Sequence, residues 1–254
     1  MEDSFLNRYA RQIRLSQVGV AGQQRLREAH VLIIGAGGLG SPVSMYLAAA
    51  GVGTIAISDF DRVDESNLSR QIVHSQANLG ESKASSAKQT LKALNPGVVV
   101  EAFDYELDGV ELEEQVRAAD VVADCTDNFP SRFALNRITR KTGTPLVTGA
   151  AIRWEGQVAT FVPADEDGPC YQCLYPDESI ETLTCEAEGI MAPVVGIIGS
   201  IQALEVINLL LEAGAGLKGR VLLMDGLAFA CHTIELPKNN NCPVCAQARV
   251  LPKN

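Results

Sequence analysis

The sequence has few histidines and no excess of basic residues, and each shortage argues against a kind of function. Three histidines in 254 residues offer no obvious histidine-based catalytic dyad. Lysine and arginine number 21 against 31 aspartates and glutamates, which gives a formal net charge of -10. Nothing in the bulk charge favours sequence-independent binding to nucleic acid, so any phosphate-binding site must be local.

The sequence also lacks a secretory signal and an uninterrupted membrane-spanning run. Its first 15 residues carry acidic side chains early and have no continuous apolar core. The most apolar stretch, residues 190–211, contains Gln202, Glu205 and Asn208, which would be unfavourable inside a bilayer. We therefore expect a buried helix there, and a soluble, cytoplasmic protein without a membrane partner.

The seven cysteines are too few for a disulfide scaffold, but four of them form two Cys-x-x-Cys pairs. Four soft ligands in two such pairs are typical of a closed, structural zinc site. Redox-active or unrelated cysteines are the alternative. The four candidate zinc ligands are Cys170, Cys173, Cys242 and Cys245.

The other three cysteines have no partner at metal-ligand spacing. Cys125 lies in an apolar strand and is most simply a core residue, whereas Cys231 is either a core residue or an inert surface thiol. Cys185 lies in a polar loop, where it is either idle or exposed enough to meet another chain.

Strand and helix patterns alternate through the first 151 residues. Apolar runs at 31–37, 54–61, 98–107, 120–127 and 145–151 predict strands, separated by helices such as 39–53 and about 130–141. This alternation predicts an α/β fold with a Rossmann-like, mainly parallel sheet and helices on both faces. Period-2 stretches at 156–163 and 220–237 predict additional antiparallel strands around the 190–211 helix. We expect one domain over 1–254, with halves at 1–151 and 152–254.

A glycine-rich turn follows the first predicted strand and resembles the opening of an NAD-dependent dehydrogenase. Its glycines let the backbone approach a phosphate at a helix N-terminus, and Asp59 at the end of the next strand can bind a ribose. A purely structural turn is the alternative. The glycines concerned are Gly35, Gly37, Gly38 and Gly40.

The residues after this unit favour a triphosphate over hydride transfer. Asn67, Arg70 and Gln71 follow the acidic strand end and Lys83 comes soon after, so two cations could stabilise a leaving pyrophosphate. A solvated helix start with a surface lysine is the alternative. Asp127, beside Asn128 at a later strand end, could hold Mg²⁺ or merely cap a helix.

Taken together, these residues resemble one family, the E1-like adenylyltransferases of the HesA/MoeB/ThiF type. The resemblance covers nearly the whole chain and rests on the order and spacing of several motifs. These are RYARQIRL, GAGGLGSP, AGVG, SNLSRQ, DCTDN, GAAIRWEGQ, CYQCLYP, GIMAPVVGIIGSIQALEVI and the final Cys-x-x-Cys.

The resemblance implies a role for each motif residue. Gly38 would abut the phosphates of ATP and Asp59 its ribose, and Asp127 would hold Mg²⁺ with Asn128 beside it. Arg11 would enter the ATP site of a neighbouring subunit in a homodimer, and Cys185 would be a thiol that links to the carrier in some members. The triphosphate would be bound by Asn67, Arg70 and Lys83, and Ser66 and Gln71 would also be nucleotide-binding residues.

In the implied reaction, ATP reacts with the C-terminal carboxylate of a ubiquitin-like sulfur-carrier protein ending in Gly-Gly, giving an acyl-adenylate and pyrophosphate. A persulfide donor protein would then supply sulfur, and residues 152–254 would bind the carrier and the zinc. The motifs GAAIRWEGQ and GIMAP favour the molybdopterin branch, whereas CLYPD, MDG and CPVC fit the thiamine branch equally well, which stays the alternative. An NAD-dependent oxidoreductase or a non-catalytic scaffold that binds a ubiquitin-like partner would leave several of these residues without a use.

Overall fold

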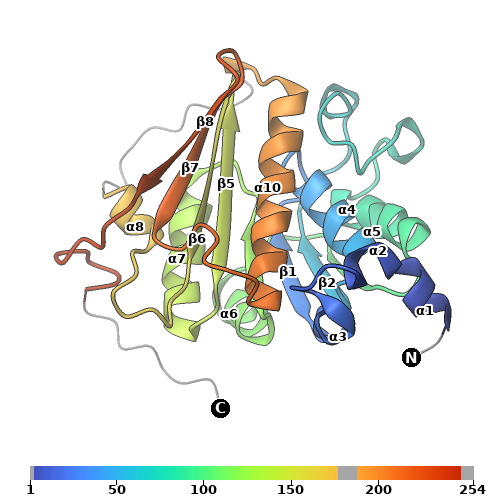
Figure 1. Ribbon diagram of the computed structural model, residues 1–254. Helices are drawn as coiled ribbons and strands as arrows, with labels where there is room; N and C mark the ends of the chain where they lie inside the picture. The colour runs from blue at the N-terminus through green and yellow to red at the C-terminus, as the bar shows by residue number, and fades with distance from the viewer. Residues whose placement is uncertain (1–2, 177–187, 247–254) are drawn as a thin grey trace.

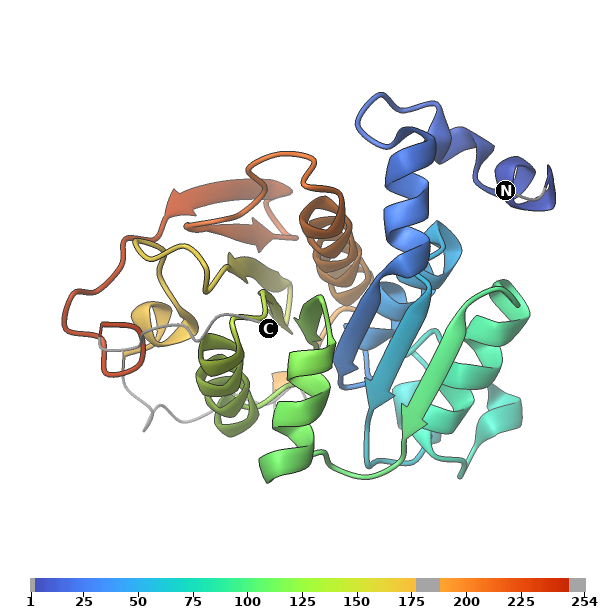
Figure 2. The ribbon, with the colours of Figure 1, turned by 90° about the horizontal axis from the view of Figure 1, so that it is seen from below.

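The computed structural model describes residues 3–176 and 188–246, which form one eight-stranded sheet with helices on both faces (Figures 1 and 2). The strand order is β3-β2-β1-β4-β5-β6-β7-β8. The strands are β1 (His30–Ile34), β2 (Thr54–Ser58), β3 (Val99–Phe103), β4 (Val121–Asp124), β5 (Leu146–Ile152), β6 (Glu155–Phe161), β7 (Arg220–Asp225) and β8 (Ala230–Glu235). The predicted α/β class with a Rossmann-like sheet is confirmed.

The first five strands are parallel and are joined by crossover helices. The strand order reverses at β1, since the chain continues from β1 to β2 on one side and later returns to β4 on the other. At such a reversal the connections after neighbouring strands diverge, which opens a crevice at the carboxyl ends of the strands. The helices are α4 (Gly40–Ala50), α5 (Lys83–Leu94), α6 (Gly109–Ala118) and α7 (Phe129–Thr142). Two short 3-10 turns, Glu65–Asn67 and Gln76–Asn78, lie between β2 and α5.

Successive side chains of each strand point to opposite faces of the sheet, so each strand contributes to a core cluster on either face. Val31 and Ile33 of β1 pack in the cluster that α4, α5 and the long helix α10 (Ala192–Leu211) cover. Leu32 of the same strand packs in the opposite cluster, with α6 and α7. Both faces of the parallel half are therefore buried, as a parallel sheet requires.

The second half adds three antiparallel strands to the same sheet, with the β7–β8 hairpin at one edge. Helix α10 is long and apolar enough to span a membrane, but half of its most apolar stretch is buried. It packs against α4, β5 and β6, and its polar residues have partners in the core. Gln202 Nε2 donates to the Asp124 carbonyl (2.9 Å), and a Glu205 oxygen accepts from Thr160 Oγ1 (2.8 Å). This is the predicted buried helix.

Three features differ from the sequence-based expectations. The N-terminal region forms α1 (Asp3–Arg8), α2 (Ala10–Ile13) and α3 (Gly19–Glu28), which the sequence patterns did not predict. A one-turn helix, α8 (Tyr171–Leu174), follows Cys170 of the first Cys-x-x-Cys pair, where the sequence patterns did not predict a helix. Strands β2 and β4 end before Asp59 and Asp127, so both acids lie in the turns beyond the sheet edge.

Candidate functional site

A cavity of about 830 Å³ lies beyond the carboxyl ends of β1, β2, β4 and β5. The topology brings the turns after these strands together there, although they are far apart in the sequence. Most of the predicted nucleotide-binding residues line it. These are Gly35, Gly37, Gly38, Asp59, Arg70, Gln71, Lys83, Asp127 and Asn128.

The glycine turn after β1 is held tightly between strand and helix. Gly35 has a φ of 96°, and a side chain there would approach the Cys125 carbonyl oxygen to 2.8 Å. A side chain on Gly40 would lie 2.0 Å from the Gly35 carbonyl oxygen. A Cβ on Gly38 would lie 2.7 Å from Val195 of α10. Gly40 therefore allows close packing within the turn and does not line the cavity. Gly38 packs closely against α10 and also lines the cavity.

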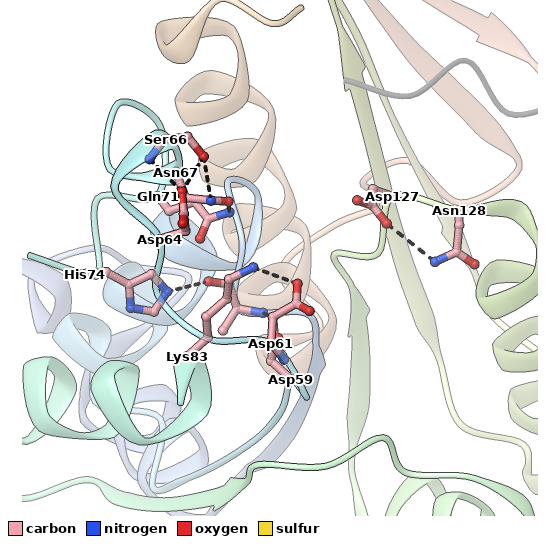
Figure 3. A network of polar contacts seen from close by, with 11 residues as sticks. Asp59, Asp61, Asp64, Ser66, Asn67, Gln71, His74, Lys83, Asp127 and Asn128 are labelled. Atoms are coloured by element: carbon pink, nitrogen blue, oxygen red, sulfur yellow. Dashed lines mark hydrogen bonds and ion pairs between the residues drawn. The ribbon is translucent and has the colours of Figure 1, made fainter. Parts of the chain in front are cut away.

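Asp59 and His74 hold the peptide groups of Ala36 in this turn from two sides (Figure 3). The Asp59 carboxylate accepts from the Ala36 amide at 2.7 Å, and His74 Nε2 donates to the Ala36 carbonyl at 2.9 Å. His74 Nδ1 lies 2.9 Å from Ser86 Oγ, so a neutral ring accepts from that hydroxyl. Burial lowers the pKa of His74 below its ordinary value of 6.5, which keeps the ring neutral.

Lys83 lies at the first position of α5 and is almost fully buried. Its Nζ donates to Asp61 Oδ2 at 2.8 Å, and the Asp61 amide donates to Asp59 Oδ1 at 2.9 Å. Burial raises the pKa of Asp59 above its ordinary value, and the positive charge of Lys83 opposes this rise. The ammonium group is thus desolvated and held at the cavity wall, rather than being an ordinary surface lysine.

Asp127 lies in the turn after β4, across from this group (Figure 3). The residue that caps α7 is Asn128, whose Oδ1 accepts from the Ser131 amide at 2.9 Å. The exposed Asp127 carboxylate meets only the Asn128 amide, at 3.4 Å, among the contacts of the described residues. Asp127 is one of several exposed carboxylates in the cavity lining, with Asp61, Glu106, Asp108 and Glu155. Such a carboxylate fits Mg²⁺, which commonly binds one or two carboxylates together with substrate phosphates.

Some predicted residues lie outside the cavity lining. Asn67 accepts from Gln71 Nε2 at 2.7 Å, and the amide and hydroxyl of Ser66 donate to Asp64 at 2.9 and 2.6 Å. Both residues therefore shape the loop that carries Arg70 and Gln71. Arg11 is exposed on α2, at the other end of this chain's fold (Figure 1). Cys185 lies outside the described residues.

The two Cys-x-x-Cys pairs come together, and all four sulfur atoms lie within 4.8 Å of one another. Cys170 Sγ is 3.6 Å from Cys242 Sγ, and Cys173 Sγ is 3.4 Å from Cys245 Sγ. A tetrahedral site with zinc–sulfur bonds of about 2.3 Å has sulfur atoms about 3.8 Å apart, so the cluster has the right size for zinc. Of the remaining described cysteines, Cys125 is buried and Cys231 is exposed.

The sequence patterns did not identify His74 and Asp61 as site residues. His74 is separated from Ala36 by a helix and a strand, so no local spacing marks the contact. Asp61 follows Asp59 closely, and a second acid after the strand end was the one available signal.

The ThiF family profile matches residues 9–244. The chain belongs to the ThiF family. It is 41% identical over 247 residues to the molybdopterin-synthase adenylyltransferase of Escherichia coli, covering 97% of this chain and 99% of that one. It is also 41% identical over 254 residues to the E. coli sulfur carrier protein ThiS adenylyltransferase, covering 99% and 100%.

Among solved structures, the fold is similar to that of E. coli MccB with MccA-N7isoASN. The TM-score is 0.82 at 22% identity, over 95% of this chain and 75% of that one. The family match and the names of the two full-length relatives identify this chain as an E1-like adenylyltransferase.

Proposed function

We propose that the protein adenylates the C-terminal glycine carboxylate of a small ubiquitin-like sulfur-carrier protein, releasing pyrophosphate and forming an acyl-adenylate. The observation that carries this is the single cavity in which the glycine turn, two cations and an accessible carboxylate converge. One E. coli relative is named as an adenylyltransferase of molybdopterin synthase and the other as an adenylyltransferase of the sulfur carrier protein ThiS, and these names support the substrate class.

The chemistry requires positioning and charge neutralisation more than acid–base catalysis. A carboxylate is already nucleophilic at neutral pH, so one of its oxygens attacks the α-phosphorus of ATP and the bond to pyrophosphate breaks. Arg70 and Lys83 would stabilise the developing charge on the pyrophosphate. Asp127 would hold Mg²⁺, which supplies further positive charge to the phosphates when bound.

The remaining site residues would orient the nucleotide. Gly38 would lie against the phosphates and Asp59 would accept from the ribose, with Gln71 and Asn67 supporting the phosphate-binding loop. Asn128 would position the turn that carries the magnesium ligand. The residues at 1–151 and 152–254 would act as one domain, which the continuous sheet supports.

We further propose that the carrier belongs to molybdopterin synthesis, because GAAIRWEGQ and GIMAP favour that branch; the thiamine carrier is the alternative. A persulfide donor protein would convert the adenylate to a thiocarboxylate. The cysteine cluster would hold a structural zinc ion, Arg11 would complete the site of a partner subunit, and Cys185 would be the carrier-linking thiol. We expect the enzyme to be cytoplasmic.

The test is ATP/pyrophosphate exchange with purified protein, Mg²⁺ and, in parallel, the molybdopterin-type and thiamine-type carriers of the source organism. Exchange with only the molybdopterin-type carrier supports the whole proposal. Exchange with only the thiamine-type carrier, or with both, corrects the pathway. No exchange with either contradicts the proposed substrate class.

A further inference from the structure

The turn after β4, which carries Asp127, is held in place from behind through Thr126. The amide and the hydroxyl of Thr126 donate to Asp124 Oδ1 at 3.0 and 2.7 Å. Its carbonyl accepts from Arg132 Nη2, on α7, at 2.7 Å. All three polar groups of Thr126 therefore have partners, and the backbone is fixed one residue before the carboxylate that lines the cavity.

Arg132 bridges the place where β4 and β5 separate. The parallel pairing of these strands ends at Asp124 and Thr148. Beyond that point, Arg132 Nη2 donates to the carbonyls of both segments, to Thr126 on one side and, at 3.2 Å, to Gly149 on the other. The guanidinium thus takes the place of the strand-to-strand hydrogen bonds that end there. The separated segments both line the cavity, at 125–128 and 150–152.

The bridge contains two opposite charges inside the core. Asp124 is 0% exposed and Arg132 is 8% exposed, and Asp124 Oδ2 accepts from Thr148 Oγ1 at 2.8 Å. Burial lowers the pKa of Arg132, whereas neighbouring groups, led by the Asp124 carboxylate, raise it, and the net pKa lies above its ordinary value. Apolar residues of similar volume often stabilise a core as well as a buried ion pair does. The geometry that this pair fixes is therefore its distinctive contribution.

We propose that Arg132 is a positioning residue for adenylation, which acts through Thr126 and holds the Asp127 carboxylate where it can bind a divalent cation on the phosphates. The inference rests on the proposed function, in which Asp127 holds Mg²⁺. Loss of a group that orients a metal ligand commonly weakens metal binding about ten- to hundredfold. Without the bridge, the turn could take several paths between the separated strands, and the apparent metal affinity falls with the fraction of molecules in the binding conformation.

The experiment measures metal binding directly. Mn²⁺ is titrated, with electron paramagnetic resonance as the readout, into the purified protein and its Arg132→Met and Arg132→Lys variants, each with a non-hydrolysable ATP analogue. We expect Arg132→Met to raise the Kd of Mn²⁺ about tenfold. Arg132→Lys, which keeps the charge and a donor, should raise it less. The Kd of the analogue without added divalent cation should stay the same in all three proteins.

The matched control is Arg140→Met, since Arg140 is a second buried arginine about two turns further along α7. It is 4% exposed, its Nη1 donates to the Pro163 carbonyl at 2.9 Å, and it does not line the cavity. Arg140→Met should lower the midpoint of urea unfolding, as Arg132→Met does, but leave the Kd of Mn²⁺ unchanged. If Arg132→Met does not fold, Arg132→Lys is compared with Arg140→Lys instead.

A double variant shows whether Arg132 acts through Asp127. Asp127→Ala should itself raise the Kd of Mn²⁺, and adding Arg132→Met should raise it no further, because the turn then has no carboxylate to position. An unchanged Kd in the Arg132 variants that fold, an equal rise in the Arg140 control, or additive losses in the double variant overturns the proposal.

The same measurements separate this inference from the proposed function. If Asp127→Ala leaves the Kd of Mn²⁺ unchanged, the metal-binding role of Asp127 fails and the positioning role of Arg132 fails with it. If the Mn²⁺ results are as expected but neither carrier supports pyrophosphate exchange, the proposed substrate fails while the positioning role stands.

Discussion

At the scale of single residues, the site depends on a second layer of side chains behind those that would touch ATP. His74 and Asp59 fix the Ala36 peptide from its carbonyl and amide sides, and Asp61 links Asp59 to Lys83. The residues of the glycine turn could be predicted because their spacing forms a motif. The supporting contacts could not, because they join positions that only the folded chain brings together.

Replacing His74 by phenylalanine should raise the KM for ATP about tenfold while lowering kcat less. The substitution leaves the Ala36 carbonyl without its buried donor, at a cost of about 1–3 kcal/mol. His74→Gln, which can still donate to that carbonyl, should recover part of the loss. Pyrophosphate exchange at varied ATP concentration measures both constants, and an unchanged KM for ATP in His74→Phe would contradict this role.

The same residue predicts a pH dependence of stability. The folded pKa of His74 is lowered by burial, so below about 6.5 the unfolded chain takes up a proton that the folded chain refuses, and the free energy of unfolding falls. The charged groups that act on the ring are Lys83, which lowers its pKa, and Asp59, which raises it. Urea titrations between pH 7.5 and about 5 should show a smaller decrease in His74→Phe than in the wild type; equal slopes would contradict the assignment.

Substitutions of Asp127 and Asn128 should have different effects, the first on adenylation and the second on the stability that helix capping provides. Asp127→Ala should lower adenylation at least about a hundredfold without changing the unfolding free energy by more than about 0.5 kcal/mol, because it caps nothing. Asn128→Ala should lower the stability by about 1 kcal/mol, since it removes the N-cap of α7. Urea unfolding and pyrophosphate exchange on both variants check this, and near-normal exchange by Asp127→Ala would remove it from the site.

At the scale of elements, the four-cysteine cluster, which we propose holds zinc, joins the segment around α8 to the C-terminal segment after β8. Cys242→Ser should lose the metal and lower the unfolding free energy by several kcal/mol, because binding of a structural metal is coupled to folding. Cys231→Ser is the matched control, since that thiol is exposed on β8 and outside the cluster. Zinc content and urea unfolding are measured together, and a zinc-free Cys242→Ser protein with unchanged stability would argue against the site.

Element types were easier to predict than their ends. Apolar runs, and the glycines that separate them, predict the strands and crossover helices of the parallel half, because parallel strands are buried on both faces. The ends of β2 and β4 depend on where the strands lose their neighbours, which composition does not report. Helices α1–α3 lack a strong apolar stripe, and in α3 the buried residues are Gly22, Gln23 and Leu26, so periodicity did not reveal it.

At the scale of the whole molecule, the long helix α10 leaves part of its apolar surface uncovered. Together with α4 and the segment before α5 it forms a shallow exposed groove, and such a patch is typical of a subunit interface. The groove is lined by Pro42, Tyr46, Ile72, Pro193, Gly196, Ile197, Ser200, Ile201 and Leu204. We expect this face to be the contact of the proposed homodimer.

Leu204→Glu should therefore convert the dimer to a monomer, as measured by light scattering, and lower adenylation because Arg11 of the partner is lost. Val99→Glu, an exposed apolar position on the outer strand β3, is the control and should change neither property. If Arg11 acts across the interface, mixing the inactive Arg11→Ala and Lys83→Ala variants should restore about a quarter of the sites. Half of the dimers then contain one subunit of each variant, and one of the two sites in each mixed dimer is complete. A wild type that scatters as a monomer, or no recovery on mixing, would contradict this arrangement.

The sequence by itself determined the fold class, the family and the residues that we propose for the site, because motif spacing and alternating apolar runs are local properties of the chain. Only the tertiary structure decided which of those residues share one cavity and that Asn128 rather than Asp127 caps the helix. It also decided that His74 supports the glycine turn and that Arg132 bridges the separated ends of β4 and β5. These are contacts between segments distant in sequence, and they exist only once the crossovers have brought the carboxyl ends of the strands to one edge.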